Sequence, residues 1–282
     1  MELIKPTEFA RYFDHTLLKP EATTDDIRRL VEEAFHYGFY GVCVNPVYVD
    51  LAARLVEDIL AEYQPESGES DISSNLPDED FFDMEVVEVS DEEEDEDETI
   101  AVVAVIDFPL GSSTAKMKAL QTERVVDLGA DEVDMVIPIG YLKERNYKMV
   151  ERHIAEVVRA AGGDERQVVV KVILETGLLT EDEKKIAAAI AAAAGADFVK
   201  TSTGFLGKGA TVEDVRLLRQ VVGPHVGVKA SGGIRTAEAA IAMIDAGATR
   251  LGTSRTVKIM KEYIALYHGE KPEANGDDEG GY

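Results

Sequence analysis

The sequence predicts a single-domain α/β protein, a (β/α)8 barrel of the TIM type, and three observations support this. Short runs rich in β-branched residues alternate eight times with amphipathic helical stretches, the pattern of a parallel sheet built from βα units. Without one acidic segment of 36 residues, 246 of the 282 residues remain, close to the roughly 250 residues typical of this barrel. No GxGxxG turn follows an early strand, which disfavours a doubly wound open sheet.

Each unit pairs a short apolar run with a helical pattern of about three turns or more. Strands are expected at Tyr12–Leu18, Gly41–Asn45, Ile100–Phe108, Ala130–Ile137, Gln167–Glu175, Ala196–Thr201, Val226–Ala230 and Thr249–Gly252. Helices are expected at Thr24–Tyr37, Pro46–Tyr63, Thr114–Leu128, Asn146–Ala161, Thr180–Ala194, Thr211–Val222, Thr236–Ala246 and Arg255–Tyr267. The first, fifth and sixth of these helices begin with a threonine cap and an acidic first turn, which marks a helix start.

The net charge of −26 is concentrated in one segment of the chain. Residues 64–99 contain 17 of the 55 acidic residues and none of the 29 basic ones. Because such like-charge blocks usually stay solvated and disordered, we expect a disordered acidic insertion at 64–99. Barrel units 1 and 2 then occupy 1–63, and units 3 to 8 occupy 100–268. The remaining residues, 269–282, are acidic and glycine-rich, and they are expected to form a flexible tail.

Three interpretations of the acidic insertion stay open. It is a solvated surface loop, an adaptation to high salt, or a docking segment for a basic partner. It falls between a helix and the next strand, which in a barrel is the face away from the usual active site. The terminal Tyr282 either folds over the active site or stays disordered with the tail.

Composition excludes several classes of function. Acidic residues outnumber basic ones by 55 to 29, which argues against nucleic acid and against an anionic membrane surface as partners. No stretch approaches the roughly 20 apolar residues of a membrane helix. Cys43 is the single cysteine, so an intrachain disulfide is impossible. With no secretory signal visible, a reducing cytoplasmic location is expected.

Four neighbouring strands each carry one charged residue between apolar ones. Side chains alternate along a strand, so Asp134, Lys171, Lys200 and Lys229 are expected to point into the barrel. Burying charges unpaired is costly, and one acid cannot neutralise three lysines, which disfavours a purely architectural ion pair. A desolvated, crowded lysine has a lowered pKa, and its neutral amine can form a Schiff base with a carbonyl. An acid and a second lysine within reach supply proton transfer.

The last two predicted strands end in small, glycine-rich turns. Ser231-Gly232-Gly233 follows the seventh strand and Gly252-Thr253-Ser254 ends the eighth, and each opens a helix. Backbone N–H groups at such turns bind phosphate, and these two loops form the usual phosphate site of a barrel. We therefore expect a small substrate that carries both a carbonyl and a phosphate.

A metal centre is not expected. The five histidines lack metal-ligand spacing, which disfavours metal-dependent chemistry; they are His15, His36, His153, His225 and His268. His15 is expected to have a structural role. Cys43 is interpreted as a small buried apolar residue.

Several motifs between Phe13 and about Thr256 resemble the deoxyribose-phosphate aldolase family of class I aldolases. The stretches that carry the resemblance are Asp14–Pro20, Gly41–Pro46, Phe108–Gly111, Gly129–Val136, Lys171–Gly177, Gly195–Gly204 and Val228–Arg235. The resemblance implies that Lys200 forms the Schiff base and that Asp134 and Lys229 relay protons. It also implies reversible cleavage of 2-deoxy-D-ribose 5-phosphate to acetaldehyde and D-glyceraldehyde 3-phosphate, without a metal or other cofactor.

The resemblance further implies a set of substrate-binding residues and a homo-oligomer, either a dimer or a tetramer. The substrate-binding residues would be Asp14, Cys43, Lys171, Thr203, Gly204, Gly232, Gly233, Thr253 and Ser254. The glycines, Thr253 and Ser254 would surround the phosphate, and Asp14, Cys43 and Lys171 would line the rest of the pocket.

Two positions depart from the family pattern, and two alternative functions stay open. Lys208, in a loop poorer in glycine than is usual, is expected to be solvated, and Arg255 either touches phosphate or starts the last helix. One alternative is a Schiff-base aldolase for another sugar phosphate, which a substrate panel would separate. The other is a non-catalytic barrel whose acidic insertion binds a basic partner. The presence of Lys200, Asp134 and Lys229 disfavours the second.

Overall fold

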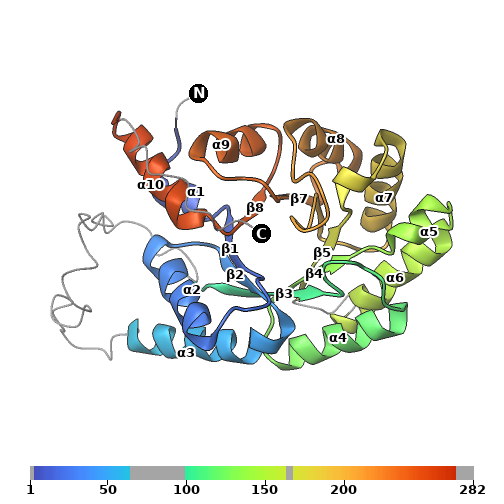
Figure 1. Ribbon diagram of the computed structural model, residues 1–282, viewed down its shortest axis with the longest axis horizontal. Coiled ribbons are helices and arrows are strands. Elements are labelled where there is room, and N and C mark those ends of the chain that lie inside the picture. Colours follow the sequence, from blue (N-terminus) through green and yellow to red (C-terminus); the bar gives the residue numbers. More distant parts are fainter. Residues whose placement is uncertain (1–2, 64–98, 163–167, 271–282) are drawn as a thin grey trace.

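The protein is described from a computed structural model that covers residues 3–63, 99–162 and 168–270. Eight parallel strands close a barrel in chain order, and helices surround it (Figure 1). The predicted (β/α)8 fold is therefore confirmed. The predictions of disorder at 64–99 and of a flexible tail at 269–282 fall almost wholly outside the described residues, as does the position of Tyr282.

Both sets of predicted elements are confirmed, with ends within two residues for all but one. The strands are β1 (Phe13–Leu17), β2 (Gly41–Val44), β3 (Ala101–Ile106), β4 (Glu132–Val136), β5 (Val169–Ile173), β6 (Phe198–Lys200), β7 (Gly227–Ser231) and β8 (Arg250–Thr253). The long helices are α2 (Thr24–Tyr37), α3 (Val49–Tyr63), α4 (Ala115–Asp127), α6 (Tyr147–Ala160), α7 (Glu181–Ala193), α8 (Val212–Val222), α9 (Ala237–Asp245) and α10 (Thr256–Tyr267).

Short elements account for the differences. The helix expected from Pro46 starts as a 3-10 turn, η1 (Pro46–Tyr48), before α3 begins. Three further elements were not predicted because they are too short to show a helical period; they are α1 (Pro6–Ala10), α5 (Ile139–Lys143) and η5 (Thr176–Leu178).

Threonine caps mark where five of the helices begin, including the three for which the sequence predicts such a cap. Thr23, Thr180 and Thr211 each accept a hydrogen bond from a backbone N–H in the first turn of α2, α7 and α8. The backbone N–H groups of Thr23 and Thr180 in turn each donate a hydrogen bond to the acidic side chain three residues later, which completes a capping box. These caps satisfy backbone donors that a helix leaves unpaired at its start.

The two faces of each strand are buried in different places, as the alternation predicts. Val133, Met135 and Ile137 pack against helices in the outer core, with Val199 and Val228 beside them. A second, smaller cluster fills part of the barrel interior; it consists of Leu18, Cys43, Val103 and Val105, with Phe108 packed against it. Apolar side chains therefore fill only part of the barrel interior.

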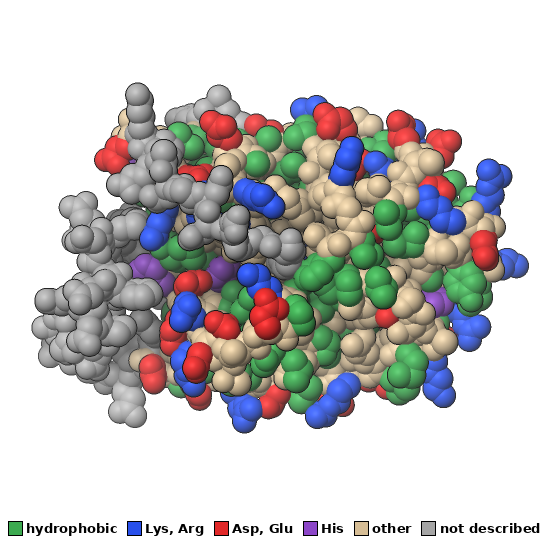
Figure 2. Space-filling model, in the orientation of Figure 1, with side chains coloured by type: hydrophobic (Ala, Val, Ile, Leu, Met, Phe, Trp, Pro, Cys, Tyr) green, Lys and Arg blue, Asp and Glu red, His purple; other side chains and the backbone are tan. Residues whose placement is uncertain are grey.

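The surface carries both signs of charge. Figure 2 shows lysine, arginine, aspartate and glutamate side chains interspersed over the face in view, among the residues drawn in colour. Within the described ranges, no helix has the length and apolar character needed to cross a membrane.

Candidate active site

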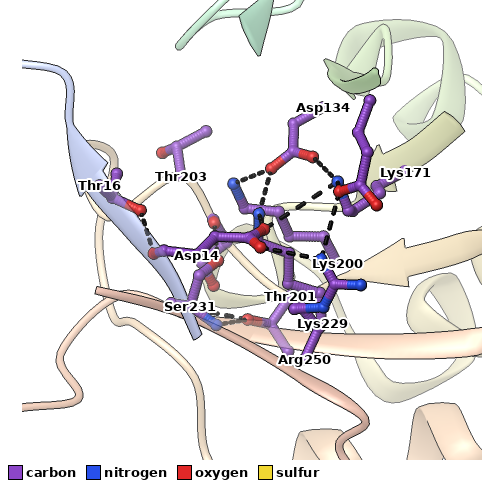
Figure 3. A network of polar contacts seen from close by, with 12 residues as sticks. Asp14, Thr16, Asp134, Lys171, Lys200, Thr201, Thr203, Lys229, Ser231 and Arg250 are labelled. Carbon is purple, nitrogen blue, oxygen red and sulfur yellow. Dashed lines mark hydrogen bonds and ion pairs between the residues drawn. The ribbon is translucent and has the colours of Figure 1, made fainter. Parts of the chain in front are cut away.

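The four charged residues predicted to face inward meet inside the barrel (Figure 3). Strand register brings them together: Asp134 on β4 is level with Lys171 on β5, and Lys200 on β6 is level with Lys229 on β7. All four are buried, and only Lys200 retains some exposure, at 3% against 0% for the other three. The closed barrel thus assembles one polar cluster from residues up to 95 positions apart in the chain.

Asp134 is the centre of this cluster. Its Oδ2 accepts hydrogen bonds from Lys200 Nζ and Lys229 Nζ, both at 2.7 Å, and its Oδ1 accepts one from Lys171 Nζ at 3.0 Å. Burial acts to raise the pKa of this carboxyl, but the three lysines outweigh it and hold the pKa well below the usual range. Asp134 is therefore a carboxylate at neutral pH.

Two more carboxylates and an arginine complete the network. Lys229 also donates to Oδ2 of Asp14, and Arg250 Nη1 donates to Oδ1 of Asp14 at 2.9 Å. Glu132 accepts from Arg250 at 3.2 Å and forms an ion pair with Lys171. Burial alone would raise the pKa of Asp14, but Lys229 and Arg250 lower it far below its usual value.

The expectation of one acid facing three lysines was therefore incomplete. Glu132 and Arg250 were missed, although strand alternation contains the signal for both: Glu132 stands two residues before Asp134, and Arg250 two before Gly252. The network holds four cations and three carboxylates. Positive charge remains in excess, but by less than the sequence suggested.

The three lysines differ in pKa. Burial lowers the pKa of the Lys200 amine, and repulsion by the charge of Lys229 lowers it further. Attraction to Asp134 raises the pKa but does not outweigh these effects, so the pKa of Lys200 lies below its ordinary value. For Lys171 and Lys229, burial also acts to lower the pKa, but the neighbouring carboxylates outweigh it and the pKa of each is raised. Lys200 is therefore the lysine of the cluster that most readily becomes a neutral, nucleophilic amine.

A pocket lies beside this cluster, at the ends of β7 and β8. The residues that line it are Gly204, Gly232, Gly233, Ile234, Arg235, Gly252, Thr253, Ser254 and Arg255. They include five of the six predicted substrate-binding residues that follow β6, β7 and β8. The pocket adjoins the lysines, because a Cβ added at Gly252 would lie 3.0 Å from Cε of Lys229.

The backbone conformation of this pocket explains why glycine occupies two of its positions. Gly232 and Gly233 adopt φ of +84° and +78°, a region that favours glycine. The loop after β6 also approaches closely, since Ala210 N donates to the carbonyl oxygens of Ser231 and Gly232. Side chains at these positions would be strained and would fill the space in which backbone N–H groups can meet an anion.

The remaining predicted substrate-binding residues do not line this pocket, and two of them, Asp14 and Lys171, belong to the charged network. Thr203 bonds through its N and Oγ1 to Oε2 of Glu175, at 3.1 and 2.5 Å. Glu175 is a buried carboxylate that the sequence reasoning missed; its φ of +59° marks a local turn within the Lys171–Gly177 motif. Cys43 lies in the interior cluster, where burial raises the pKa of its thiol to about 11, so the thiol stays protonated.

Other sequence expectations can be compared with the structure. Lys208 is exposed, as predicted, and Arg255 both lines the pocket and immediately precedes α10. Among the described residues, no group of three or more histidine, cysteine, aspartate or glutamate side chains is placed to hold a metal ion.

We expect Asp14→Asn to destabilise the protein by about 3–5 kcal/mol at pH 7, since it leaves Lys229 and Arg250 buried without full compensation. The pKa of Asp14 is lowered on folding, so its contribution is present above the unfolded value near 4 and is lost as the pH falls further. Urea denaturation at pH 7 and near pH 3 measures the free energy of unfolding of both proteins.

The matched control is Asp50→Asn, which removes an exposed ion pair with Arg54 and should change stability little at either pH. Equal effects of the two variants would contradict the prediction.

Comparison with known proteins agrees with this arrangement. The model of the DeoC/LacD aldolase family matches residues 9–257. A deoxyribose-phosphate aldolase of Coprothermobacter proteolyticus is 49% identical over 255 residues, which cover 90% of this chain and 97% of that protein. One from Halalkalibacterium halodurans is 47% identical over 266 residues, covering 94% and 97%.

Solved structures give the same result. The deoxyribose phosphate aldolase of Aeropyrum pernix, described as tetrameric, superposes with a TM-score of 0.74 at 31% identity and covers 94% of each chain. The family match spans the barrel strands, the lysine cluster and the glycine-lined pocket. The chain thus belongs to the DeoC/LacD family of aldolases.

Proposed function

We propose that this enzyme reversibly cleaves 2-deoxy-D-ribose 5-phosphate into acetaldehyde and D-glyceraldehyde 3-phosphate through a Schiff base on Lys200. The observation that carries the proposal is the contrast among the three lysines bonded to Asp134: of these, only Lys200 has a lowered pKa and some exposure. The neighbouring pocket supplies a place for the phosphate. The names and high coverage of the relatives support the same reaction.

The chemistry begins with the open-chain form of the sugar. The neutral amine of Lys200 attacks C1, and loss of water from the resulting carbinolamine leaves an iminium ion. Removal of the proton from the C3 hydroxyl breaks the C2–C3 bond, releases glyceraldehyde 3-phosphate, and moves the electron pair into an enamine. Protonation at C2 and hydrolysis by water then release acetaldehyde and regenerate the amine.

Asp134 and Lys229 are proposed to move the protons. Asp134 Oδ2 lies 2.7 Å from both amines, so one carboxylate can exchange protons between Lys200 and Lys229 without a change of position. Lys229 also donates a hydrogen bond to Asp14, which helps to fix its position. In the proposal, Cys43 and Lys171 belong to the wall of the site, with Lys171 fixing Asp134 by its bond to Oδ1.

The phosphate is proposed to bind in the pocket at the ends of β7 and β8. Gly204, Gly232 and Gly233 contribute backbone groups, and Thr253 and Ser254 lie at the end of β8, just before α10. Anions are favoured there because unpaired N–H groups and the helix dipole point outward at a helix start. Thr203 is proposed to shape this side of the pocket through Glu175.

We also infer that the enzyme works in the cytoplasm as a homo-oligomer. The single buried cysteine suits a reducing compartment. The tetrameric relative from Aeropyrum pernix supports an oligomer, either a dimer or a tetramer. Nucleic acid and membranes are not expected as partners, because acidic residues outnumber basic ones by 55 to 29.

Borohydride reduction in the presence of acetaldehyde should trap an adduct on Lys200, seen by peptide mass mapping. Lys200→Ala should lose the adduct and lower kcat/KM for 2-deoxyribose 5-phosphate by about 10⁴- to 10⁶-fold, as for loss of other catalytic nucleophiles. Lys208→Ala removes an exposed lysine nearby and should leave both unchanged. An unlabelled Lys200 in folded protein would contradict the mechanism, and faster cleavage of another sugar phosphate in a substrate panel would contradict the substrate.

The pH dependence of adduct formation should move upward in Lys229→Met. In the wild type the charge of Lys229 helps to lower the pKa of Lys200, so its removal raises that pKa and the neutral amine appears at higher pH. The measurement is the rate of trapping with acetaldehyde as a function of pH. Lys229→Arg keeps the charge and should stay near the wild-type profile; a profile unchanged in Lys229→Met would oppose the assigned coupling.

Salt should lower KM for the phosphorylated sugar. The chain carries a net charge of −26, which repels an anionic substrate, and the screening length falls from about 10 Å at 0.1 M to 3 Å at 1 M salt. Kinetics in increasing potassium chloride measure this effect. Unphosphorylated 2-deoxyribose is the control and should show little change; equal or lower KM for the phosphorylated sugar in dilute buffer would contradict the expectation.

A further inference from the structure

His15 lies directly behind the phosphate pocket and is not used by the chemistry above. It follows Asp14 on β1 but faces the other side of the strand, toward the helices, and is 5% exposed. Its Nε2 lies 2.6 Å from Oε2 of Glu33 on α2, and its Nδ1 lies 3.1 Å from Oγ1 of Thr256, the first residue of α10. Phe39 contacts the ring at 5.3 Å between centroids.

Hydrogen bonds continue from His15 into the wall of the pocket. Thr256 Oγ1, which is in contact with the His15 ring, also lies 3.0 Å from the carbonyl oxygen of Thr253 and donates to it. Thr253 lines the pocket, and its Oγ1 donates to the carbonyl oxygen of Ile234 at 2.8 Å and accepts from Arg255 N at 3.1 Å. His15 is thus two hydrogen bonds away from a residue of the pocket lining.

This connection fixes the part of the pocket that presents backbone donors. No side chain caps the start of α10, so the N–H groups of its first turn are left for another acceptor. Thr256 is the first residue of this turn, and His15 is in contact with its hydroxyl. The strand register connects His15 to the pocket a second time, because His15 on β1 is the direct Cα partner of Thr253 on β8.

We propose that His15 is a positioning residue for phosphate recognition, acting through Thr256 on the Thr253–Arg255 loop and the start of α10. It does not line the pocket itself. The ligand named here, the phosphate of the substrate, rests on the proposed function. If His15 has this role, substituting it should weaken binding of the phosphate group while the chemistry at Lys200, inside the barrel, continues.

The test compares two sugars that differ only in the phosphate, 2-deoxyribose 5-phosphate and 2-deoxyribose. In His15→Leu and in Thr256→Val, the ratio of their kcat/KM values should fall about tenfold, the size expected for loss of one buried hydrogen bond. The loss should appear in KM for the phosphorylated sugar. His15→Asn keeps a donor near Thr256 and should recover most of the ratio. The double variant should lose no more than either single one, because both remove the same link.

His153→Leu is the matched control. His153 is the other buried histidine of the described residues, 3% exposed on α6, and its loss should leave the ratio unchanged. Equal losses for both sugars in the His15 variants, or no loss for either, would overturn the proposal and leave His15 a structural residue. Calorimetric titration with inorganic phosphate gives a second readout, with affinity expected to fall in His15→Leu. If the wild type cleaves neither sugar, the proposed function fails and this titration alone decides the role of His15.

Discussion

The contact of one carboxylate with three lysines is the interaction on which the interior depends. Asp134 reaches Lys171, Lys200 and Lys229 within 3.0 Å, so each lysine's electrostatic environment includes the same negative charge. Charges buried at low dielectric are tolerated only when compensated. Without Asp134 the cluster would hold three mutually repelling ammonium groups, and the strands that carry them would be destabilised together.

Barrel closure is what makes this compensation possible. Asp14 comes from β1 and Arg250 from β8, and these strands pair only because the sheet closes on itself. Asp14 thereby becomes a second carboxylate for Lys229, which raises the pKa of that lysine, while Lys200 bonds only to Asp134. The asymmetry between two adjacent lysines, on which Schiff-base chemistry rests, therefore follows from the topology of the fold.

The first strand contributes to both halves of the site through adjacent residues. Asp14 faces inward to the lysine network, and His15 faces outward to Glu33 and the start of α10. Alternation along a strand thus allows one short segment to support proton transfer on one side and the phosphate pocket on the other. The two functions can be separated by mutation because they use opposite faces of the same backbone.

Local patterns in the sequence determined the order of the elements, the threonine caps and the inward direction of Asp134, Lys171, Lys200 and Lys229, because periodicity and capping depend on neighbours along the chain. The glycine turns after β7 and β8 were recognisable for the same reason, and the family motifs pointed to Lys200. Strand alternation also places Glu132 and Arg250 on the inner face, but only the tertiary structure decided which charged groups they meet. It also decided that Lys200 differs from Lys229 in pKa and that His15 reaches Thr256. These facts depend on distances between residues as far apart as β1 and β8, and no local pattern contains those distances.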